Sequence, residues 1–371
     1  MEIPFPAAAP VVVVSASIGA GHDGAAAEIA RRLHLAGVPV RRVDYLDLLP
    51  EGWGRAIRQT YARQLAYAPA SWGWLLAAMG RPGATRRAAW LATRAAQRRL
   101  LAVAGPAPAA VVSTYPLASQ ALGRLRRTRQ LPAPAVAVLT DPSVHPLCVA
   151  PGIDLHLAPN DEAAAVVRDL YGLPAATNAP IVDPAFRPSR DAADVLAARR
   201  QHGLPPDARL ALVVAGSWGV GDVDATVRDL AAATEAIPVV VCGQNTALRY
   251  RMAATGRVIA LGWVDDMPSL LRAADVAVQN AGGLTGLEAL ASGVPLISYR
   301  CLPGHGVANA AVLERIGLAA WPRTPAGLAA ALAAATGQRT AAGYAALTAA
   351  AEATELIRSV ARLETAAAVP A

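Results

Sequence analysis

His22 and Asp141 are two side chains whose types and settings suit proton transfer. His22 lies in a glycine-rich stretch after the apolar run 11–14, and Asp141 follows a second apolar run at 136–139. Such runs are typical of buried parallel strands, and open α/β sheets bind ligands where those strands end. We therefore expect both side chains to face a cleft. An imidazole there can act as a general base, since its ordinary pKa of about 6.5 is close to neutral pH.

Two further glycine-rich loops have the composition of phosphate-binding sites. One is Gly216-Ser217-Trp218-Gly219-Val220-Gly221, and the other is Asn280-Ala281-Gly282-Gly283-Leu284-Thr285. Each follows a predicted strand. Small residues let backbone N–H groups approach phosphate oxygens, and the dipole of a following helix stabilises the negative charge. The two loops therefore predict a site for a phosphorylated ligand.

The glycine loop around His22 also admits other interpretations. Residues 19–24 read Gly-x-Gly-x-x-Gly, and Asp44 ends the next predicted strand, as in a dinucleotide-binding oxidoreductase. Two observations oppose this: residues 15–18 separate the apolar run from the first glycine, and Asp23 at the helix N-terminus would repel a pyrophosphate. We predict instead that Asp23 caps the helix. A strand, turn and helix without any ligand is the third interpretation.

The elements that must position these loops alternate along the whole chain. Short apolar runs separated by helical Ala/Arg/Leu stretches predict an α/β fold with parallel sheets covered on both faces. Strands are predicted at 11–15, 38–43, 110–113, 136–139, 154–157, 210–214, 239–242, 258–261, 276–278 and 295–299. A proline-rich interval at 184–194 predicts a linker between a first domain, 1–183, and a second, 195–340. Residues 341–371 are expected to form a helix that packs back toward the first domain.

Composition and charge narrow the classes of protein. No apolar run approaches the about 20 residues that a membrane-spanning helix needs, and the first residues lack the basic segment of a signal peptide. Three widely separated cysteines, at 148, 242 and 301, predict neither a disulfide framework nor a zinc site. We therefore expect a cytoplasmic protein. Residues 52–140 contain 13 Arg and no acidic residue in a chain of net charge +7, which implies an anionic partner for the first half.

Several segments, taken in order, resemble the monogalactosyldiacylglycerol synthase and processive diacylglycerol glucosyltransferase family, and more distantly the N-acetylglucosaminyl transferase that forms lipid II. The segments, between residues 15 and 310, are SASIGAGHDGAAAEIARRL, VVSTYPLAS, TDPSVHPLCVAPGIDLHLAPND, PIVDPAFRP, VVVCGQNTALRYRM and ALGWVDDMPSLLRAADVAVQNAGGLTGLEALASGVPLISYRCLPGHGVANA. The resemblance implies a GT-B fold, in which two Rossmann-like domains face each other across a cleft. It also implies an inverting, metal-independent transfer of a hexose from a UDP-sugar, with no cofactor.

The resemblance places the donor in the second domain. Val264 matches the position whose backbone reads the uracil, and Glu288 matches the carboxylate that accepts both ribose hydroxyls. The implied donor-binding residues are Gly216, Ser217, Gly219, Val264, Asn280, Gly282, Gly283, Leu284, Thr285, Glu288, His305 and Asn309. No Asp-x-Asp stands where it would hold a metal in this arrangement, so oriented dipoles must stabilise the leaving diphosphate.

On the acceptor side, the resemblance implies roles for Gly21 and for the pattern T-D-x-x-x-H, which Asp141 and His145 match. An inverting transfer needs a base that takes the proton of the acceptor hydroxyl. His22 and Asp141 are both candidates, and one of them can be the base while the other orients it. The sequence leaves this choice open.

Two positions depart from the family pattern. The relatives usually carry Gln-Glu or Gln-Gln in contact with sugar hydroxyls, where this chain has His305-Gly306. Glycine has no side chain that could bind a hydroxyl, so the identity of the donor sugar stays open. Ser217-Trp218 also replaces smaller residues in the first glycine loop of the second domain.

The segment 53–99 has the composition of a membrane-binding surface. Four of the seven Trp lie at 53, 72, 74 and 90, and on a helix Arg87, Trp90, Arg94 and Arg98 share one face. We expect peripheral binding to anionic lipid at the inner face of the cell membrane and a lipid or other hydrophobic acceptor. A soluble natural-product acceptor and an inactive membrane-binding module are the alternatives. No recognised nucleic-acid-binding motif accompanies the charge, so no nucleic acid partner is expected.

Overall fold

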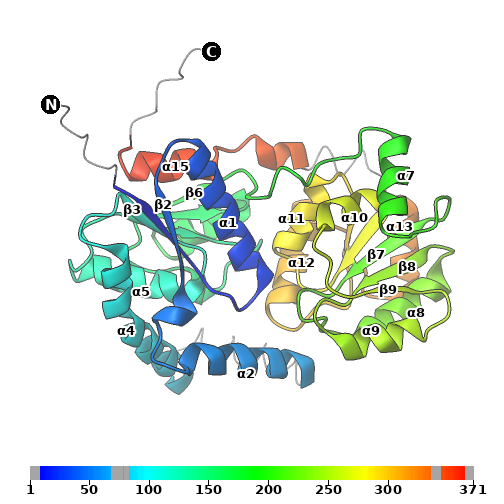
Figure 1. The fold of residues 1–371 in the computed structure, drawn as a ribbon, viewed down its shortest axis with the longest axis horizontal. Helices are drawn as coiled ribbons and strands as arrows, with labels where there is room; N and C mark the ends of the chain where they lie inside the picture. Colours follow the sequence, from blue (N-terminus) through cyan, green and yellow to red (C-terminus); the bar gives the residue numbers. More distant parts are fainter. Residues whose placement is uncertain (1–8, 68–77, 79–82, 336–343, 364–371) are drawn as a thin grey trace, which may run out of the picture.

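The computed structural model describes residues 9–67, 78, 83–335 and 344–363. These residues form two sheets that lie next to each other, each flanked by helices (Figure 1). The strand order is β2-β1-β3-β4-β5-β6 in the first sheet and β11-β10-β7-β8-β9 in the second. Every strand pairing is parallel. The predicted α/β architecture is confirmed.

The first sheet contains one strand that the sequence does not predict. The strands are β1 (Val11–Ser15), β2 (Val40–Asp44), β3 (Ala110–Ser113), β4 (Ala135–Val138), β5 (Leu155–Ala158) and β6 (Ala175–Thr177). The helical elements of this half are α1 (Ala20–Leu35), η1 (Tyr45–Leu48), α2 (Trp53–Tyr67), α4 (Ala84–Ala104), α5 (Pro116–Arg127), η2 (Pro146–Cys148), α6 (Asp161–Ala165) and the π-helical turn η3 (Val166–Leu170). The short β6 has no apolar run to reveal it and is a strand through its pairing with β5.

The second sheet matches the predicted strands to within two residues at each end. Its strands are β7 (Leu210–Val214), β8 (Ile237–Val241), β9 (Ile259–Leu261), β10 (Val276–Gln279) and β11 (Leu296–Ser298). Its helices are α7 (Ala192–Gln201), α8 (Val223–Ala233), α9 (Thr246–Ala253), α10 (Met267–Ala273), α11 (Leu284–Ala291), α12 (His305–Arg315) and α13 (Pro325–Ala334). The loops after β7 and β10 are the two predicted phosphate-binding loops.

Each sheet is buried on both faces, which explains the uninterrupted apolar strands. In β1, Val12 and Val14 face one core, while Val11 and Val13 face another, and all four are fully buried. The second sheet likewise separates two cores, one of which contains Leu212 and the other Val213. Full burial of each such side chain stabilises the fold by about 1.5–3 kcal/mol. The strand ends, and the loops that follow them, are therefore held rigidly.

The predicted capping role of Asp23 is wrong. Helix α1 begins at Ala20, and its N-cap is Gly19, which has an extended backbone. Asp23 therefore lies inside the first turn, where its carboxylate accepts a hydrogen bond of 2.6 Å from the Ser15 hydroxyl. The helix starts earlier than predicted, so that its first turn contains both His22 and Asp23.

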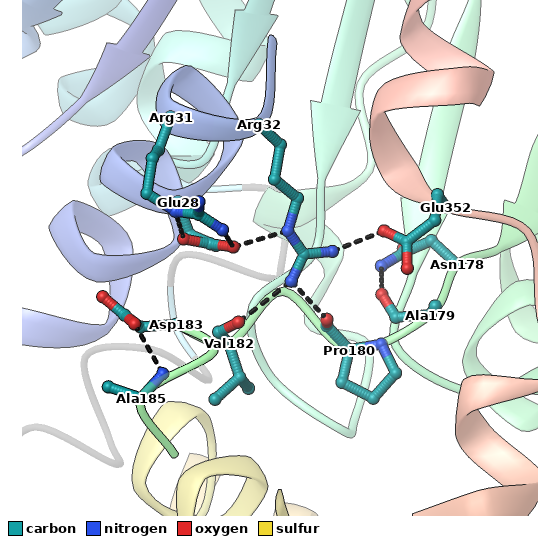
Figure 2. A network of polar contacts seen from close by, with 10 residues as sticks. All are labelled: Glu28, Arg31, Arg32, Asn178, Ala179, Pro180, Val182, Asp183, Ala185 and Glu352. Carbon is teal, nitrogen blue, oxygen red and sulfur yellow. Dashed lines mark hydrogen bonds and ion pairs between the residues drawn. The ribbon is translucent and has the colours of Figure 1, made fainter. Parts of the chain in front are cut away.

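A buried ion pair ties α1 to the segment that crosses between the sheets (Figure 2). Glu28 is only 4% exposed, and its carboxylate binds the Arg32 guanidinium and that of the neighbouring Arg31. Arg32 also donates to the backbone carbonyls of Pro180, at 3.2 Å, and Val182, at 2.9 Å. Removing one partner of a buried pair costs about 3–5 kcal/mol. The helix that carries His22 is thus held against the crossing segment.

The chain returns to the first sheet near its end. Arg32 also contacts the carboxylate of Glu352, the N-cap of α15 (Ala353–Val360) (Figure 2). Ala353 and Ile357 of this helix are buried in a core of the first sheet, whereas Tyr344 and Leu347 pack beside α11 of the second. Residues 178–182 and 344–363 are among the described segments that join the two halves.

Candidate functional site

Asp141 contacts Asn309 where the two halves of the molecule meet. Asp141 follows β4 in the first half, and Asn309 lies on α12 in the second. The Asn309 amide donates to the Asp141 carboxylate at 3.0 Å and to the carbonyl of Ala281 at 2.9 Å, while its oxygen accepts from the backbone N–H of Ser143 at 3.1 Å. Asn309 is fully buried. One predicted donor-side residue therefore joins the glycine loop after β10 to the loop that carries Asp141.

His22 lies in the first turn of α1 and is half-buried beside that contact. Its Nδ1 is 3.2 Å from the hydroxyl of Thr140, its backbone carbonyl accepts from the hydroxyl of Thr114, and its ring meets that of Tyr115 edge to face at 5.5 Å. Burial lowers the pKa of His22, and the negative charge of Asp141 opposes this effect without cancelling it. The imidazole is therefore neutral at pH 7 and able to accept a proton.

Asp141 also lies directly against the loop that precedes α11. A Cβ atom placed on Gly283 would be 2.9 Å from the Asp141 carboxylate, and Gly283 has a φ of +82°, so only glycine suits this position. Leu284 starts α11 and packs against Gly21 and Gly24 of α1. The N-terminus of α11, where backbone N–H groups attract negative charge, thus faces the two candidate bases.

Glu288 lies one turn into α11 and has an unusual environment. Burial, followed by the negative charge of Asp183, raises the pKa of Glu288 to about 7. The carboxylate of Glu288 accepts no hydrogen bond from the residues that the structure describes. By its accessible surface Glu288 is half-buried, so a ligand that supplies hydrogen-bond donors can still reach its carboxylate.

The loop after β7 lies against the loop after β10. Gly216 and Gly219 have φ values of +69° and +55°, and a Cβ atom on Gly219 would be 2.3 Å from the carbonyl of Cys242. The Asn280 amide donates to the carbonyl of Val220 at 2.7 Å, which joins this loop to the one after β10. This hydrogen bond therefore joins the two predicted phosphate-binding loops.

Trp218, on the same loop, reaches the first domain. Its indole N–H donates to the carbonyl of Ile18 at 3.4 Å. Ser217 stays within the second domain, where its carbonyl accepts from the backbone N–H of Gln244 at 2.9 Å. The bulky residue that departs from the family pattern is thus a contact across the cleft.

The departure at His305-Gly306 has a steric basis in this fold. A Cβ atom on Gly306 would be 2.7 Å from the carbonyl of Asn280, so a larger residue would displace the glycine loop. His305 is the first residue of α12, and its Nδ1 is buried without a partner among the described residues.

The other residues singled out in the sequence lie at helix starts and in loops. His145 is the N-cap of η2, and its Nδ1 accepts from the backbone N–H of Leu147 at 3.2 Å. Val264 follows β9 and packs against a core of the second sheet, and Thr285 lies in the first turn of α11. Asp44, the acid of the oxidoreductase alternative, is bound to Ser17 and caps η1.

Sequence reasoning missed several residues that surround His22. Thr140 and Tyr115 each follow a predicted strand, so the rule that sites form at strand ends could have found both. Tyr61 lies on α2, where no local signal marks it. Among the residues that the structure describes, no three His, Cys, Asp or Glu are grouped to hold a metal ion. Over the same residues, no helix is long and apolar enough to span a bilayer.

Comparison with known proteins finds similar sequences. Residues 212–337 match the model of a family described as glycosyl transferases group 1. A processive diacylglycerol beta-glucosyltransferase of Bacillus subtilis (strain 168) is 29% identical over 219 residues, which are 57% of this chain and 56% of that protein. The resemblance predicted from the ordered motifs is confirmed.

Solved structures resemble the whole fold. The MurG structure of Acinetobacter baumannii is 16% identical and has a TM-score of 0.57, with 96% of this chain and 100% of that one covered. TcCGT1 in complex with UDP is 14% identical and has a TM-score of 0.59, with the same coverage. These likenesses confirm the predicted GT-B fold. The sequence matches to the first curated relatives span only 56% to 61% of their length.

Proposed function

We propose that this protein is a glycosyltransferase that moves a hexose from a UDP-sugar to a hydroxyl of a lipid, such as a diacylglycerol. The names of the curated relatives support a glycolipid product, and the UDP-bound neighbour supports the donor class. The observation that carries the proposal is the meeting of His22 and Asp141 with the N-terminus of α11. A base from one domain there faces a phosphate-binding loop from the other.

In the proposed step, the acceptor oxygen bonds to C1 of the sugar while the bond from C1 to the diphosphate oxygen breaks. UDP leaves with the electron pair, and attack from the opposite face inverts C1. We propose His22 as the base, because burial lowers its pKa and keeps the ring neutral, while Asp141 stabilises the imidazolium that forms. Thr140 orients the ring through Nδ1.

The second domain would hold the donor without a metal. We propose that the backbone N–H groups at the start of α11 and in the loop after β7 bind the diphosphate, where the helix dipole stabilises the leaving charge. Glu288 would accept the ribose hydroxyls, and the backbone of Val264 would read the uracil. Since Asp141 lies against Gly283, the domains must separate slightly to admit the donor, a motion typical of enzymes that close over their substrates.

A ligand panel followed by product analysis tests the proposed function. UDP and UDP-sugars should raise the melting temperature, whereas NAD and NADP should not, because binding to the folded state alone stabilises it. Mass spectrometry of products from mixed UDP-sugar and lipid pools then identifies the sugar and the acceptor. Stabilisation by NAD alone would contradict the proposal, and product from soluble aglycones but not from lipids would favour the natural-product alternative.

We also propose that the segment 53–99 docks on anionic lipid at the inner face of the cell membrane. Trp53 on α2 and Leu91 on α4 are more than half exposed, which gives this surface apolar anchors beside exposed arginines. Trp72 and Trp74 lie outside the described residues, as do the side chains of Arg87 and Trp90. Arg94 and Arg98 both lie on α4, the helix on which the basic face is expected.

Replacing Arg87, Arg94 and Arg98 with Gln should weaken binding to phosphatidylglycerol vesicles by up to about 3 kcal/mol, since each Arg contributes about 1 kcal/mol. Binding of the wild type should also fall with salt, because the Debye length shrinks from about 10 Å at 0.1 M to about 3 Å at 1 M. Co-sedimentation measures both effects. The matched control replaces Arg200, Arg228 and Arg257, which are exposed in the second domain. Equal losses in the two triple variants would argue against a defined docking surface.

A further inference from the structure

Helix α2 carries one aromatic residue into the contact between the two domains. Figure 1 shows α2 running along the lower side of the first domain toward the second. Tyr61, in the middle of this helix, packs against the core of the first sheet that contains Tyr115. It also packs against the cluster of Val220 and Leu302 from the second domain. Among the side chains of α2 that the structure describes, no other is shared between these two clusters.

The ring of Tyr61 forms one side of an apolar wall. The cluster that it joins also includes Trp218, whose indole N–H reaches the backbone of Ile18 beside the first glycine loop, and Ala281 of the loop after β10. Trp218 and Tyr61 thus approach the same place from different domains. The wall lies beside the loops that the proposed function assigns to the donor.

The phenol of Tyr61 also responds to charged groups near the candidate bases. Burial, followed by the charge of Asp141, raises the pKa of Tyr61 to about 12. Burial, followed by a charge on Tyr61, raises the pKa of Tyr115, whose ring contacts that of His22. The Tyr61 hydroxyl is therefore un-ionised at pH 7 and able to donate a hydrogen bond.

We propose that Tyr61 is a positioning residue of the acceptor subsite, with its ring against the carbon chain of an amphiphilic acceptor and its hydroxyl toward Asp141. This inference rests on the proposed function, in which the acceptor hydroxyl must reach both His22 and C1 of the donor sugar. Among the residues that surround these groups, Tyr61 and Trp218 offer apolar surface next to a hydrogen-bond donor. An acceptor with a small polar head and an apolar chain fits both requirements.

The test compares three variants with dioctanoylglycerol as the acceptor and the UDP-sugar that the product analysis identifies. Tyr61→Ala should raise the KM for dioctanoylglycerol about tenfold, the loss expected when one wall of an apolar subsite is removed. Tyr61→Ala should also increase hydrolysis of the UDP-sugar, because a weakly bound acceptor no longer excludes water from the site. Tyr61→Phe keeps the wall and should mainly lower kcat, by about five- to tenfold, the effect of one lost hydrogen bond.

Tyr45→Phe is the matched control. Tyr45 is fully buried in the same core and its hydroxyl has no partner among the described residues, so loss of this hydroxyl should change neither KM nor kcat more than about twofold. Calorimetric titration with UDP checks that each variant keeps an intact donor site.

The outcomes separate the inference from the function on which it rests. A wild type that neither binds UDP nor forms a product overturns the proposed function, and this inference falls with it. A wild type that transfers sugar, with both Tyr61 variants matching Tyr45→Phe, overturns the inference alone. If Tyr61→Ala lost UDP binding, it would be misfolded, and Tyr61→Phe would then decide through the change in kcat.

Discussion

His22→Ala lowers kcat by about 10²-fold or more and leaves the affinity for UDP within about twofold of the wild type. The expected loss is large because the acceptor hydroxyl is a poor nucleophile until a base takes its proton. The UDP contacts are unaffected because the donor is proposed to bind to the second domain. Steady-state kinetics with calorimetry measures both quantities. Asp141→Asn should lower kcat by a similar factor, since it removes the charge that stabilises the imidazolium.

The pH profile distinguishes His22 as the base from a merely structural role. Because burial lowers the pKa of His22 below the ordinary value of 6.5, kcat/KM for the acceptor, measured at saturating UDP-sugar, should stay level as the pH falls from 8 to 6.5. The acid limb should appear only below that value. In Asp141→Asn the limb should move to still lower pH, since the charge of Asp141 raises the pKa of His22. Near-normal turnover in both variants would exclude both residues as the base.

Glu288→Ala weakens UDP binding by about 2–3 kcal/mol, or roughly 30- to 150-fold, because charge-assisted hydrogen bonds to two ribose hydroxyls are lost. The affinity of the wild type for UDP should also rise as the pH increases through about 7, because the Glu288 carboxyl ionises there. Glu288→Gln should lack this step, and comparing the two cancels the titration of the UDP phosphate itself. Calorimetry between pH 6 and 8 measures the difference. Equal affinities in all three proteins would remove Glu288 from the donor site.

Ionisation of Glu288 should strengthen UDP binding but should lower the stability of the folded protein without ligand. Its pKa is raised from 4.5 to about 7 in the folded state, so the folded protein binds more protons than the unfolded chain between these values. The contribution of Glu288 to stability must therefore fall as the pH rises from 4.5 to 7. Glu288→Gln avoids this loss and should melt at a higher temperature than the wild type at pH 8, with little difference at pH 4.5. Thermal scans without ligand test this; a variant that melts lower at pH 8 would contradict the burial of an unpaired carboxylate.

Much of this protein can be predicted from the sequence because the information is local. Uninterrupted apolar runs such as 210–214 identify strands that are buried on both faces, and the glycine-rich loops that follow them identify where phosphate-binding sites form. The rule that ligands bind at strand ends places His22 and Asp141 at the edge of one sheet before any contact is known. The ordered motifs add the GT-B fold. The start of α1 is harder to predict from the sequence, because Gly19 caps the helix through its backbone conformation and not through a side chain.

What only the tertiary structure decided lies between the domains. The hydrogen bond of Asn309 to Asp141, the contact of Tyr61 with Leu302 and the steric need for Gly306 beside Asn280 each join segments far apart in the sequence. No periodicity encodes such contacts, since they depend on how two separately folded sheets are oriented. That orientation rests on a few connections, among them the buried pair of Glu28 and Arg32 and the return of α15 to the first sheet. Residue types and strand ends therefore determined which groups can react, and the packing of one domain on the other decided which of them meet.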